Sequence, residues 1–189
     1  MREEILELLK STNRVNMFDF INYMENETDF FQAPASTKYH SSFEGGLALH
    51  SYNVYKCLLD VIKMNKFVKF NFDFDSVIIC ALLHDLCKTN FYKVSTRNVK
   101  NENTGKWEQV PYYEIDDQEP YGHGEKSVML IEKFIRLNDE ERYAIRFHMG
   151  AYDESARNSG NINKAFQKYP LALALHIADM MDANMGGGK

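Results

Sequence analysis

Cysteine is scarce in this chain. The three cysteines, Cys57, Cys80 and Cys87, are an odd number and lack the spacing of a disulfide framework. This argues against a small disulfide-stabilised secreted domain, because such domains carry many paired cysteines. We expect reduced thiols, as in a cytoplasmic protein.

Long apolar runs are also missing. No stretch approaches the roughly 20 residues that a membrane-spanning helix needs. The N-terminal stretch MREEILELLK is amphipathic and acidic, which is unlike a secretory signal peptide. We therefore expect a soluble cytoplasmic protein with no part in the membrane.

An excess of positive charge is absent as well. The formal net charge is −5, so we do not expect the chain to hold nucleic acid by charge alone. Bound divalent metals would nevertheless reverse the sign of the charge inside a site. No internal repeat, low-complexity tract or Pro/Ser-rich linker divides the 189 residues. A chain of this length can bury one substantial core but is short for two, so we expect a single domain over residues 1–189.

Helical periodicity is what the chain does have. Apolar residues recur three and four positions apart in most segments, as on one face of a helix. Asp75 and Asn138 precede two of these segments and are predicted to cap them. Pro170 is predicted to open the last helix. Predicted helices cover residues 2–10, 17–25, 47–64, 76–87, 125–137, 139–149, 161–168 and 171–185. Residues 31–46 are predicted to form a loop or a broken helix, and residues 150–160 a loop.

Residues 91–115 differ from the rest of the chain. The stretches FYKVSTRNVK and KWEQVPYYEI contain β-branched and aromatic residues, and they flank NENTG with its glycine. This pattern is typical of a β-hairpin. The predicted fold class is therefore an all-α domain with one inserted β-hairpin at about residues 91–115.

The chain contains six histidines, most of them at or near the ends of predicted helices. They are His40, His50, His84, His123, His148 and His176. Histidines at helix ends can converge on one cleft of a helical bundle, where such folds build their ligand sites. Imidazoles with carboxylates, and no essential thiolate, suit Mn, Fe, Co, Ni or Zn. Asp85 directly follows a histidine and has two oxygens to share, so it is the natural bridge between two ions.

Five stretches occur in a characteristic order over about residues 31–185. They are APASTKYHSSFEGGLALHSYNV, ALLHDLCK, GHGEKSV, FHMG and LALALHIADMMDANM. Together they resemble the HD-domain metal-dependent phosphohydrolases, and most closely the HD portion of the bacterial YhaM-type 3′–5′ exoribonucleases. The resemblance implies an HD-domain helical bundle. Its parts would be N-terminal helices over residues 1–30, the HD core over 31–185 and a flexible tail over 186–189.

The resemblance also implies which residues bind one or two divalent metal ions (Mn, Fe, Co, Ni, Mg or Zn). The implied ligands of the first ion are His50, His84, Asp85 and Asp179. The implied ligands of the second ion are His123 and His148, with Asp85 as a bridge. We therefore expect a binuclear metal site.

The chain departs from the family at three points. Met149 stands where the family usually has a second histidine, and Cys87 stands where the HD motif usually continues with glycine. Only about thirty residues precede the match, so we expect no dedicated nucleic-acid-binding domain such as the OB-fold of that family. Cys80, His84 and Cys87 share a stripe of the predicted helix, but small buried cysteines are common in cores. We interpret both cysteines as core residues.

Lys88 follows Asp85 by three residues and His84 by four, so it lies on the same face of the predicted helix. We predict that Lys88 is catalytic together with Asp85, where it would contact a phosphate oxygen or steady the leaving group. The alternative is a lysine in the last helical turn that complements the helix dipole.

Three further residues are candidates for supporting roles. His40 is predicted to face the substrate phosphate. His176 either holds Asp179 in place from behind or is a satisfied core histidine. Asp182, three residues after Asp179, either supports a metal ligand or belongs to a solvated helix face.

The hairpin supplies the remaining candidates for substrate binding, Tyr92, Arg97 and Trp107. Basic residues interleaved with aromatic ones can hold phosphates and stack on a base. The alternative is that the aromatic residues only hold the two strands together.

The residues and the resemblance together predict a metal-dependent phosphohydrolase, of the hydrolase class EC 3.1. The predicted substrate is a phosphoester or phosphodiester of a nucleotide or a short oligonucleotide. One alternative is a 3′–5′ exonuclease acting on single-stranded RNA or DNA. The other is a non-catalytic module that binds metal and nucleotide.

Overall fold

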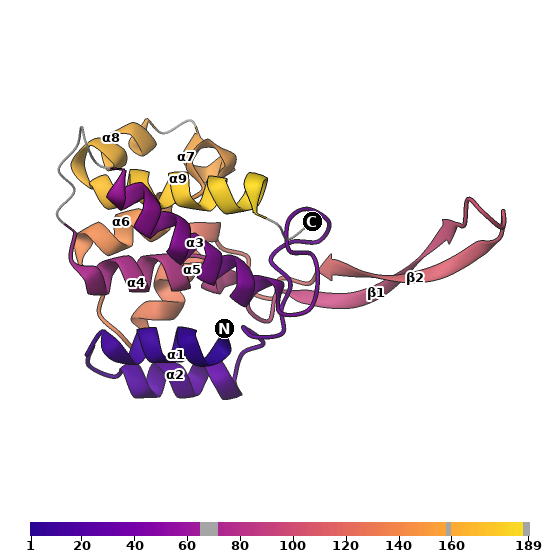
Figure 1. Ribbon diagram of the computed structural model, residues 1–189, viewed down its shortest axis with the longest axis horizontal. Helices are drawn as coiled ribbons and strands as arrows, with labels where there is room; N and C mark the ends of the chain where they lie inside the picture. The colour runs from indigo at the N-terminus through magenta and orange to yellow at the C-terminus, as the bar shows by residue number, and fades with distance from the viewer. Residues whose placement is uncertain (65–71, 158–159, 187–189) are drawn as a thin grey trace.

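The computed structural model describes residues 1–64, 72–157 and 160–186. Over these residues the chain is mostly helical and contains one two-stranded antiparallel sheet (Figure 1). The predicted combination of helices with one hairpin is confirmed at this level. Most of the predicted tail, residues 187–189, lies outside the described residues.

Most elements agree with the predicted segments to within a few residues. The α-helices are α1 (Arg2–Ser11), α2 (Met17–Asn26), α3 (Gly46–Lys63), α4 (Phe74–Leu83), α5 (His123–Glu132), α6 (Asp139–Phe147), α7 (Glu154–Arg157), α8 (Asn161–Lys168) and α9 (Pro170–Met185). The 3₁₀ helices are η1 (Leu86–Lys88) and η2 (Gly150–Tyr152). The strands are β1 (Tyr92–Lys100) and β2 (Trp107–Ile115). None of the helices within the described ranges combines the length and the apolar character that a membrane span requires.

Two predicted helix starts are confirmed. The Asn138 side chain accepts a hydrogen bond from the Glu141 N–H (2.9 Å), and the Glu141 carboxylate accepts one from the Asn138 N–H (2.8 Å). These bonds satisfy N–H groups that a helix start leaves without an intrahelical partner. Helix α9 begins at Pro170, whose fixed φ and missing N–H suit the first helical turn.

Helix α4 differs from its prediction. We expected residues 76–87 with Asp75 as the cap, but Asp73 occupies the N-cap position and the helix ends at Leu83. The stretch ALLHDLCK contains no glycine or proline, and most of it is buried, so the apolar pattern continues past the real helix end. The adjacent histidine and aspartate therefore lie in the turn between α4 and η1.

The region predicted as a loop, residues 150–160, is also more structured than expected. Its described part contains η2, with 3 residues, and α7, with 4 residues. Such short helices do not complete enough turns to produce a periodic apolar pattern. Sequence periodicity therefore could not reveal them.

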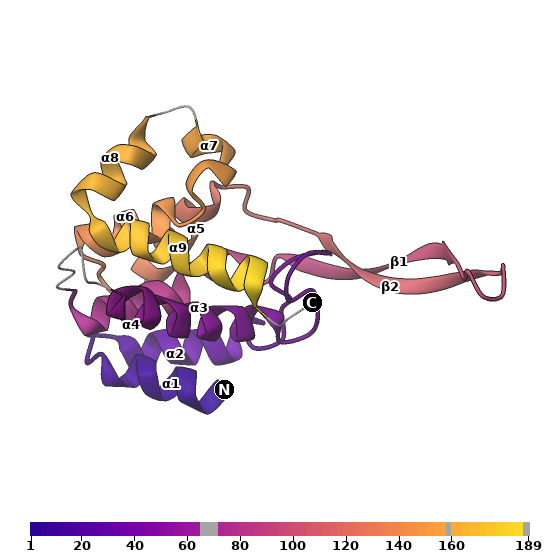
Figure 2. The same cartoon turned by 45° about the horizontal axis from the view of Figure 1, so that its top comes forward.

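Helix α4 lies at the centre of the helical body (Figure 1). Every residue from Ser76 to Leu83 is buried, as expected from its apolar sequence. It packs against α1, α3, α6 and α9, and α3 also lies along α9 in both views (Figures 1 and 2). This packing brings the end of α4 close to α3 and α9, where the candidate site forms.

The hairpin projects away from the helical body in both views (Figures 1 and 2). Its strands pair from Tyr92 opposite Ile115 at the base to Lys100 opposite Trp107 near the tip. Most of its side chains are exposed. The hairpin therefore contributes little to the core and presents its residues to solvent.

Candidate metal centre

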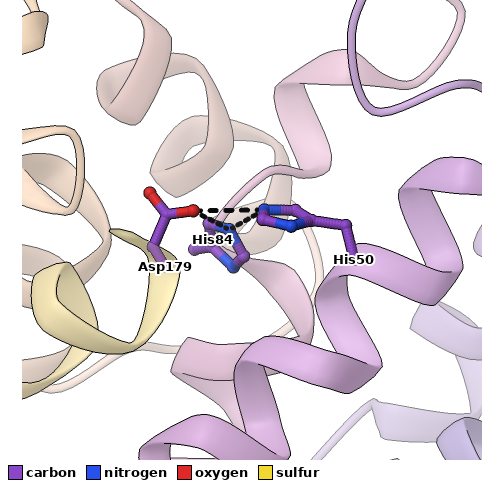
Figure 3. Close-up of side chains that lie close together, drawn as sticks. All are labelled: His50, His84 and Asp179. Carbon is purple, nitrogen blue, oxygen red and sulfur yellow. Dashed lines mark hydrogen bonds and ion pairs between the residues drawn. The ribbon is translucent and has the colours of Figure 1, made fainter. Parts of the chain in front are cut away.

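Three side chains from three parts of the fold meet in the interior (Figure 3). His50 lies near the start of α3, His84 directly follows α4, and Asp179 lies in α9. The His50 Nε2 atom is 3.3 Å from His84 Nε2 and 3.2 Å from Asp179 Oδ1, and His84 Nε2 is 4.0 Å from that oxygen. Tetrahedral nitrogen and oxygen ligands of one ion lie about 3.4 Å apart. The three atoms are therefore close to the spacing of ligands around one metal.

Asp85 lies between this group and two further histidines. Its Oδ2 atom is 3.5 Å from the Nε2 atoms of both His50 and His84. Its Oδ1 atom is 2.8 Å from His123 Nε2 and 3.3 Å from His148 Nε2. The two oxygens of one buried carboxylate thus face two different pairs of imidazoles, which is the arrangement that a bridge between two ions requires.

The ring orientation of three of these histidines is set from behind. His50 Nδ1 lies 2.7 Å from an Asp182 carboxylate oxygen. His84 and His148 each place Nδ1 on the backbone carbonyl three residues earlier, at 2.9 and 2.7 Å. Because each partner can only accept, each Nδ1 carries a proton, so Nε2 is the atom that presents a lone pair when the ring is neutral. Among the residues that the structure describes, no hydrogen-bond partner meets the buried Nε2 atom of His148, as expected of a ligand atom.

Burial and charge together determine the protonation of the first group. Burial disfavours the charged ring of His84 and lowers its pKa to about 3. Burial also lowers the pKa of His50, but the carboxylates of Asp179, Asp182 and Asp85 outweigh it and raise that pKa well above 6.5. Burial raises the pKa of Asp179, but its hydrogen bond to His50 outweighs this effect and the pKa falls below its ordinary value. The group therefore favours a positive charge among its carboxylates, as a cation site does.

Burial and neighbouring groups also set the pKa values of His123 and Asp85. Burial lowers the pKa of His123, but the neighbouring Cys87 and the hydrogen bond to Asp85 outweigh burial and raise it to about 10. Burial raises the pKa of Asp85, yet Lys88 and the surrounding imidazoles bring it well below its ordinary value. Asp85 is therefore ionised and available as a ligand.

Lys88 lies beside Asp85, with its Nζ atom 2.7 Å from Oδ2. Burial lowers the pKa of Lys88, but Asp85 and the nearby Tyr92 outweigh burial and raise it above its ordinary value. The ammonium stays charged and mostly buried. It lies in η1 instead of on α4, so it reaches Asp85 across a 3₁₀ turn.

His40 and Tyr92 also border the centre. The His40 ring is 4.8 Å from the His50 ring, and its buried Nε2 atom has no hydrogen-bond partner in the described part of the chain. The Tyr92 hydroxyl donates to the Ala35 carbonyl at 3.4 Å, so it joins the base of the hairpin to the loop that carries His40. Burial raises the pKa of Tyr92 to about 12. Both side chains therefore lie at the edge of the centre, on the side of the hairpin base.

Asp182 and His176, for which two roles were open, make different contacts. Asp182 is buried and bonds His50, so it holds this candidate ligand from behind and is not part of a solvated face. His176 had two predicted alternatives, and its observed hydrogen bond is not to Asp179: its Nδ1 donates to the His148 carbonyl at 2.6 Å. Three residues along an α-helix rotate by about 300°, so neighbouring side chains can still diverge by about 60°.

Arg97 and Trp107 lie at different positions along the hairpin. Arg97 lines a cavity of about 460 Å³ at the base of the hairpin, together with residues 37 and 38 of the loop that carries His40. Trp107 is 70% exposed and pairs with Lys100 beside the tip. At about 3.4 Å per residue it lies roughly 27 Å along the strand from the base. The structure does not bring Trp107 to the histidines.

Cys87 is the residue that our sequence interpretation missed. Its sulfur lies 3.3 Å from Nδ1 and 3.6 Å from Nε2 of His123. We had placed it with Cys80 on one stripe of a helix, but α4 ends before it. Cys80 instead lies in the core, with its thiol against the Glu141 carbonyl. A cysteine two positions after the aspartate of the His84-Asp85 pair, where the resembled family has glycine, was the available signal.

A second cavity, of about 810 Å³, lies elsewhere, between α5, α6 and α8. Its lining includes none of the histidines or aspartates of the centre. The chain matches no protein-family model, no curated protein and no solved structure. What the centre can do must therefore be inferred from its own residues and from the motifs that carry the family resemblance.

Proposed function

We propose that this chain is a metal-dependent phosphohydrolase of the HD superfamily, acting on a phosphoester or phosphodiester of a nucleotide or short oligonucleotide. The observation that carries the proposal is the position of Asp85, whose two oxygens face two separate pairs of imidazoles. Paired divalent ions, about 3.5–4 Å apart, are the usual arrangement in enzymes that displace an oxygen at phosphorus.

The donor set fits divalent ions of the first transition row. Neutral imidazole nitrogens and carboxylate oxygens are ligands that these ions accept. His50, His84, Asp85 and Asp179 would hold one ion, and Asp85 with His123 and His148 would hold the other. Ions bound there would supply hydroxide at neutral pH and polarise a phosphoryl oxygen.

Lys88 and His40 would act on the substrate itself. The ammonium of Lys88 stays charged beside Asp85, so it can neutralise a phosphate oxygen as negative charge develops. The Nε2 atom of His40 is buried and, when it carries a proton, can donate a hydrogen bond to a phosphate oxygen. Both side chains are partly buried, which reduces the screening of these contacts by water.

A second candidate function is 3′–5′ exonuclease activity on single-stranded RNA or DNA. The projecting hairpin favours it, because its exposed Trp107 could stack on a base. Its cations, Lys93, Arg97 and Lys100, lie on the neighbouring strand and could follow a phosphate backbone. A small nucleotide bound at the centre would not extend as far as Trp107.

Turnover of bis-p-nitrophenyl phosphate by the purified chain in Mn²⁺ or Co²⁺ tests the proposal against the alternative of a binding module. We expect Asp85→Asn, which keeps the size of the side chain, to lower turnover by at least about 100-fold. It should also lower the number of bound metal ions. His123→Ala should lose one ion and keep the other.

Three results would contradict this proposal. The first is a parent protein that binds metal but turns over neither this ester nor any of a panel of nucleotides. The second is an Asp85→Asn variant as active as the parent. The third is saturation at one ion per chain with His123→Ala unaffected, which would leave a mononuclear site.

A further inference from the structure

Cys87 lies beside His123, in the part of the candidate metal centre proposed to hold the second ion. A glycine at this position would offer no side-chain ligand. Its Sγ atom, Asp85 Oδ1 and a ring nitrogen of His123 form a group whose ligand atoms all lie within 4.8 Å of one another. His148 falls in a different group, with His84 and Asp85. The candidate ligand atoms grouped with His123 are therefore one oxygen and one sulfur.

The spacing between these atoms matches metal ligation. Zinc bonds of about 2.3 Å to sulfur and about 2.05 Å to nitrogen, at a tetrahedral angle, put the two ligand atoms about 3.6 Å apart. The Cys87 Sγ atom lies 3.6 Å from His123 Nε2. The same Nε2 atom lies 2.8 Å from Asp85 Oδ1, so it faces both partners.

Cys87 and His123 are held in this relation by the elements that carry them. Cys87 lies in η1, two residues after Asp85, and its N–H donates to the Ser127 Oγ atom at 3.0 Å. Ser127 lies in α5, one turn after His123 at the start of that helix. This hydrogen bond ties η1 to α5. Cys87 is 2% exposed, so its thiol is not a surface group.

A second feature points to a ligand at the same place. The Nε2 atom of His148 is buried and lies 3.3 Å from Asp85 Oδ1, and no hydrogen-bond partner for it occurs within residues 1–64, 72–157 and 160–186. An unsatisfied buried nitrogen is costly unless something binds it. It approaches the oxygen that also faces His123, so it can complete the coordination of an ion placed there.

We propose that Cys87 is a sulfur ligand of the second ion, together with Asp85, His123 and His148. This inference rests on the proposed binuclear function. On binding the ion, the thiol releases its proton to solvent and the sulfur becomes a thiolate. Thiolate is a soft ligand, so the second position prefers Zn²⁺, Co²⁺ or Fe²⁺ over Mg²⁺ and Mn²⁺. The first position, with nitrogen and oxygen ligands only, lacks this preference.

Titration of the metal-free chain with Co²⁺ under reducing conditions tests the sulfur directly. A thiolate on Co²⁺ gives an intense near-ultraviolet charge-transfer band that nitrogen and oxygen ligands do not give. We expect the band to grow as the second ion binds. In Cys87→Ser it should vanish, and the second ion should bind at least about tenfold more weakly. Cys57→Ser, a change at a half-buried cysteine in α3, should keep the band.

A zinc-edge X-ray absorption spectrum of the parent needs no variant, so this test does not depend on whether Cys87→Ser folds. It should show a sulfur neighbour at about 2.3 Å. A parent that binds two Co²⁺ ions without the band, or a band that survives in Cys87→Ser, overturns the inference.

Turnover of bis-p-nitrophenyl phosphate on the same samples separates this inference from the proposed function. A band that depends on Cys87, in protein without turnover, supports the sulfur ligand and contradicts the enzyme. Turnover with two bound ions and no band supports the enzyme and contradicts the sulfur ligand.

Discussion

His50 is held between two carboxylates. Its Nδ1 atom is 2.7 Å from Asp182, and its Nε2 atom is 3.2 Å from Asp179. A carboxylate behind a metal-binding histidine fixes the tautomer and makes the imidazole a better ligand. Asp182 is 5% exposed, so water does not compete for this bond.

Asp182→Asn should therefore weaken the first metal position. The amide keeps the shape but removes the charge, and we expect the affinity for the first ion to fall by about 10–100-fold. Titration against a competing chelator measures the change. Asp60→Asn, at an exposed carboxylate later in α3, is the matched control and should bind metal like the parent. Equal affinity in both variants would remove Asp182 from the site.

At the scale of elements, one buried carboxylate joins three parts of the fold. Glu141 in the first turn of α6 is completely buried, and it accepts a hydrogen bond from Ser76 of α4 at 2.7 Å. It also forms an ion pair with Arg14, which lies between α1 and α2. The pair thereby ties the N-terminal helices to the body that carries the metal centre.

Arg14→Ala should destabilise the fold without touching the chemistry. The substitution leaves the Glu141 charge buried without its ionic partner, which costs on the order of 3 kcal/mol of unfolding free energy. Denaturant unfolding of the metal-free chain measures it. Arg2→Ala, which breaks the partly exposed pair with Glu25, should change the stability by less than about 1 kcal/mol. Similar losses in both variants would mean that Glu141 is not held by Arg14.

The projecting hairpin allows the two candidate substrates to be distinguished. Trp107 lies near its exposed tip. Trp107→Ala should leave the turnover of bis-p-nitrophenyl phosphate and the melting temperature unchanged, because neither depends on the tip. It should weaken the binding of a single-stranded oligonucleotide about tenfold, since one stacked base is lost.

Replacing the tip, residues 102–106, with a short Gly-Ser turn gives a second measurement of the same element. We expect the thermal stability to remain nearly unchanged, because the tip makes its hydrogen bonds within the hairpin. A large loss of stability with unchanged kinetics would make the hairpin structural. Equal losses for the small ester and the oligonucleotide would remove its role in strand binding.

At the scale of the whole molecule, we expect metal binding to be coupled to pH. In spite of burial, the carboxylates around His50 raise its pKa, and the pKa of His123 is raised to about 10, so both rings favour the charged form in the metal-free chain. Metal requires neutral imidazole. Each of these rings must therefore release about one proton when its ion binds, and the affinity for metal should fall as the pH is lowered.

Calorimetric titrations at pH 7, in two buffers with different ionisation enthalpies, measure the protons released. We expect the metal affinity to increase between pH 6 and pH 8 and proton release to occur with both ions. His84 should contribute no proton, because burial lowers its pKa to about 3. Binding without proton release would mean that His50 and His123 are neutral before the metal arrives.

The sequence by itself determined the local structure and most of the residues that meet at the centre. Apolar periodicity, the Asn138 cap and the β-branched stretches are properties of neighbouring residues, so they predict the helices and the hairpin without tertiary information. The His84-Asp85 pair and the histidines near helix ends were also readable, because metal chemistry limits the useful side-chain types.

Only the tertiary structure decided where those side chains point. The end of α4 before His84 is marked by no glycine or proline, and it moves Cys87 from a helix stripe to within 3.3 Å of His123. The helix packing turns His176 to the His148 carbonyl, and the projection of the hairpin carries Trp107 away from the centre. Side-chain direction depends on where elements end and on what packs against them, and those contacts join residues far apart in the chain.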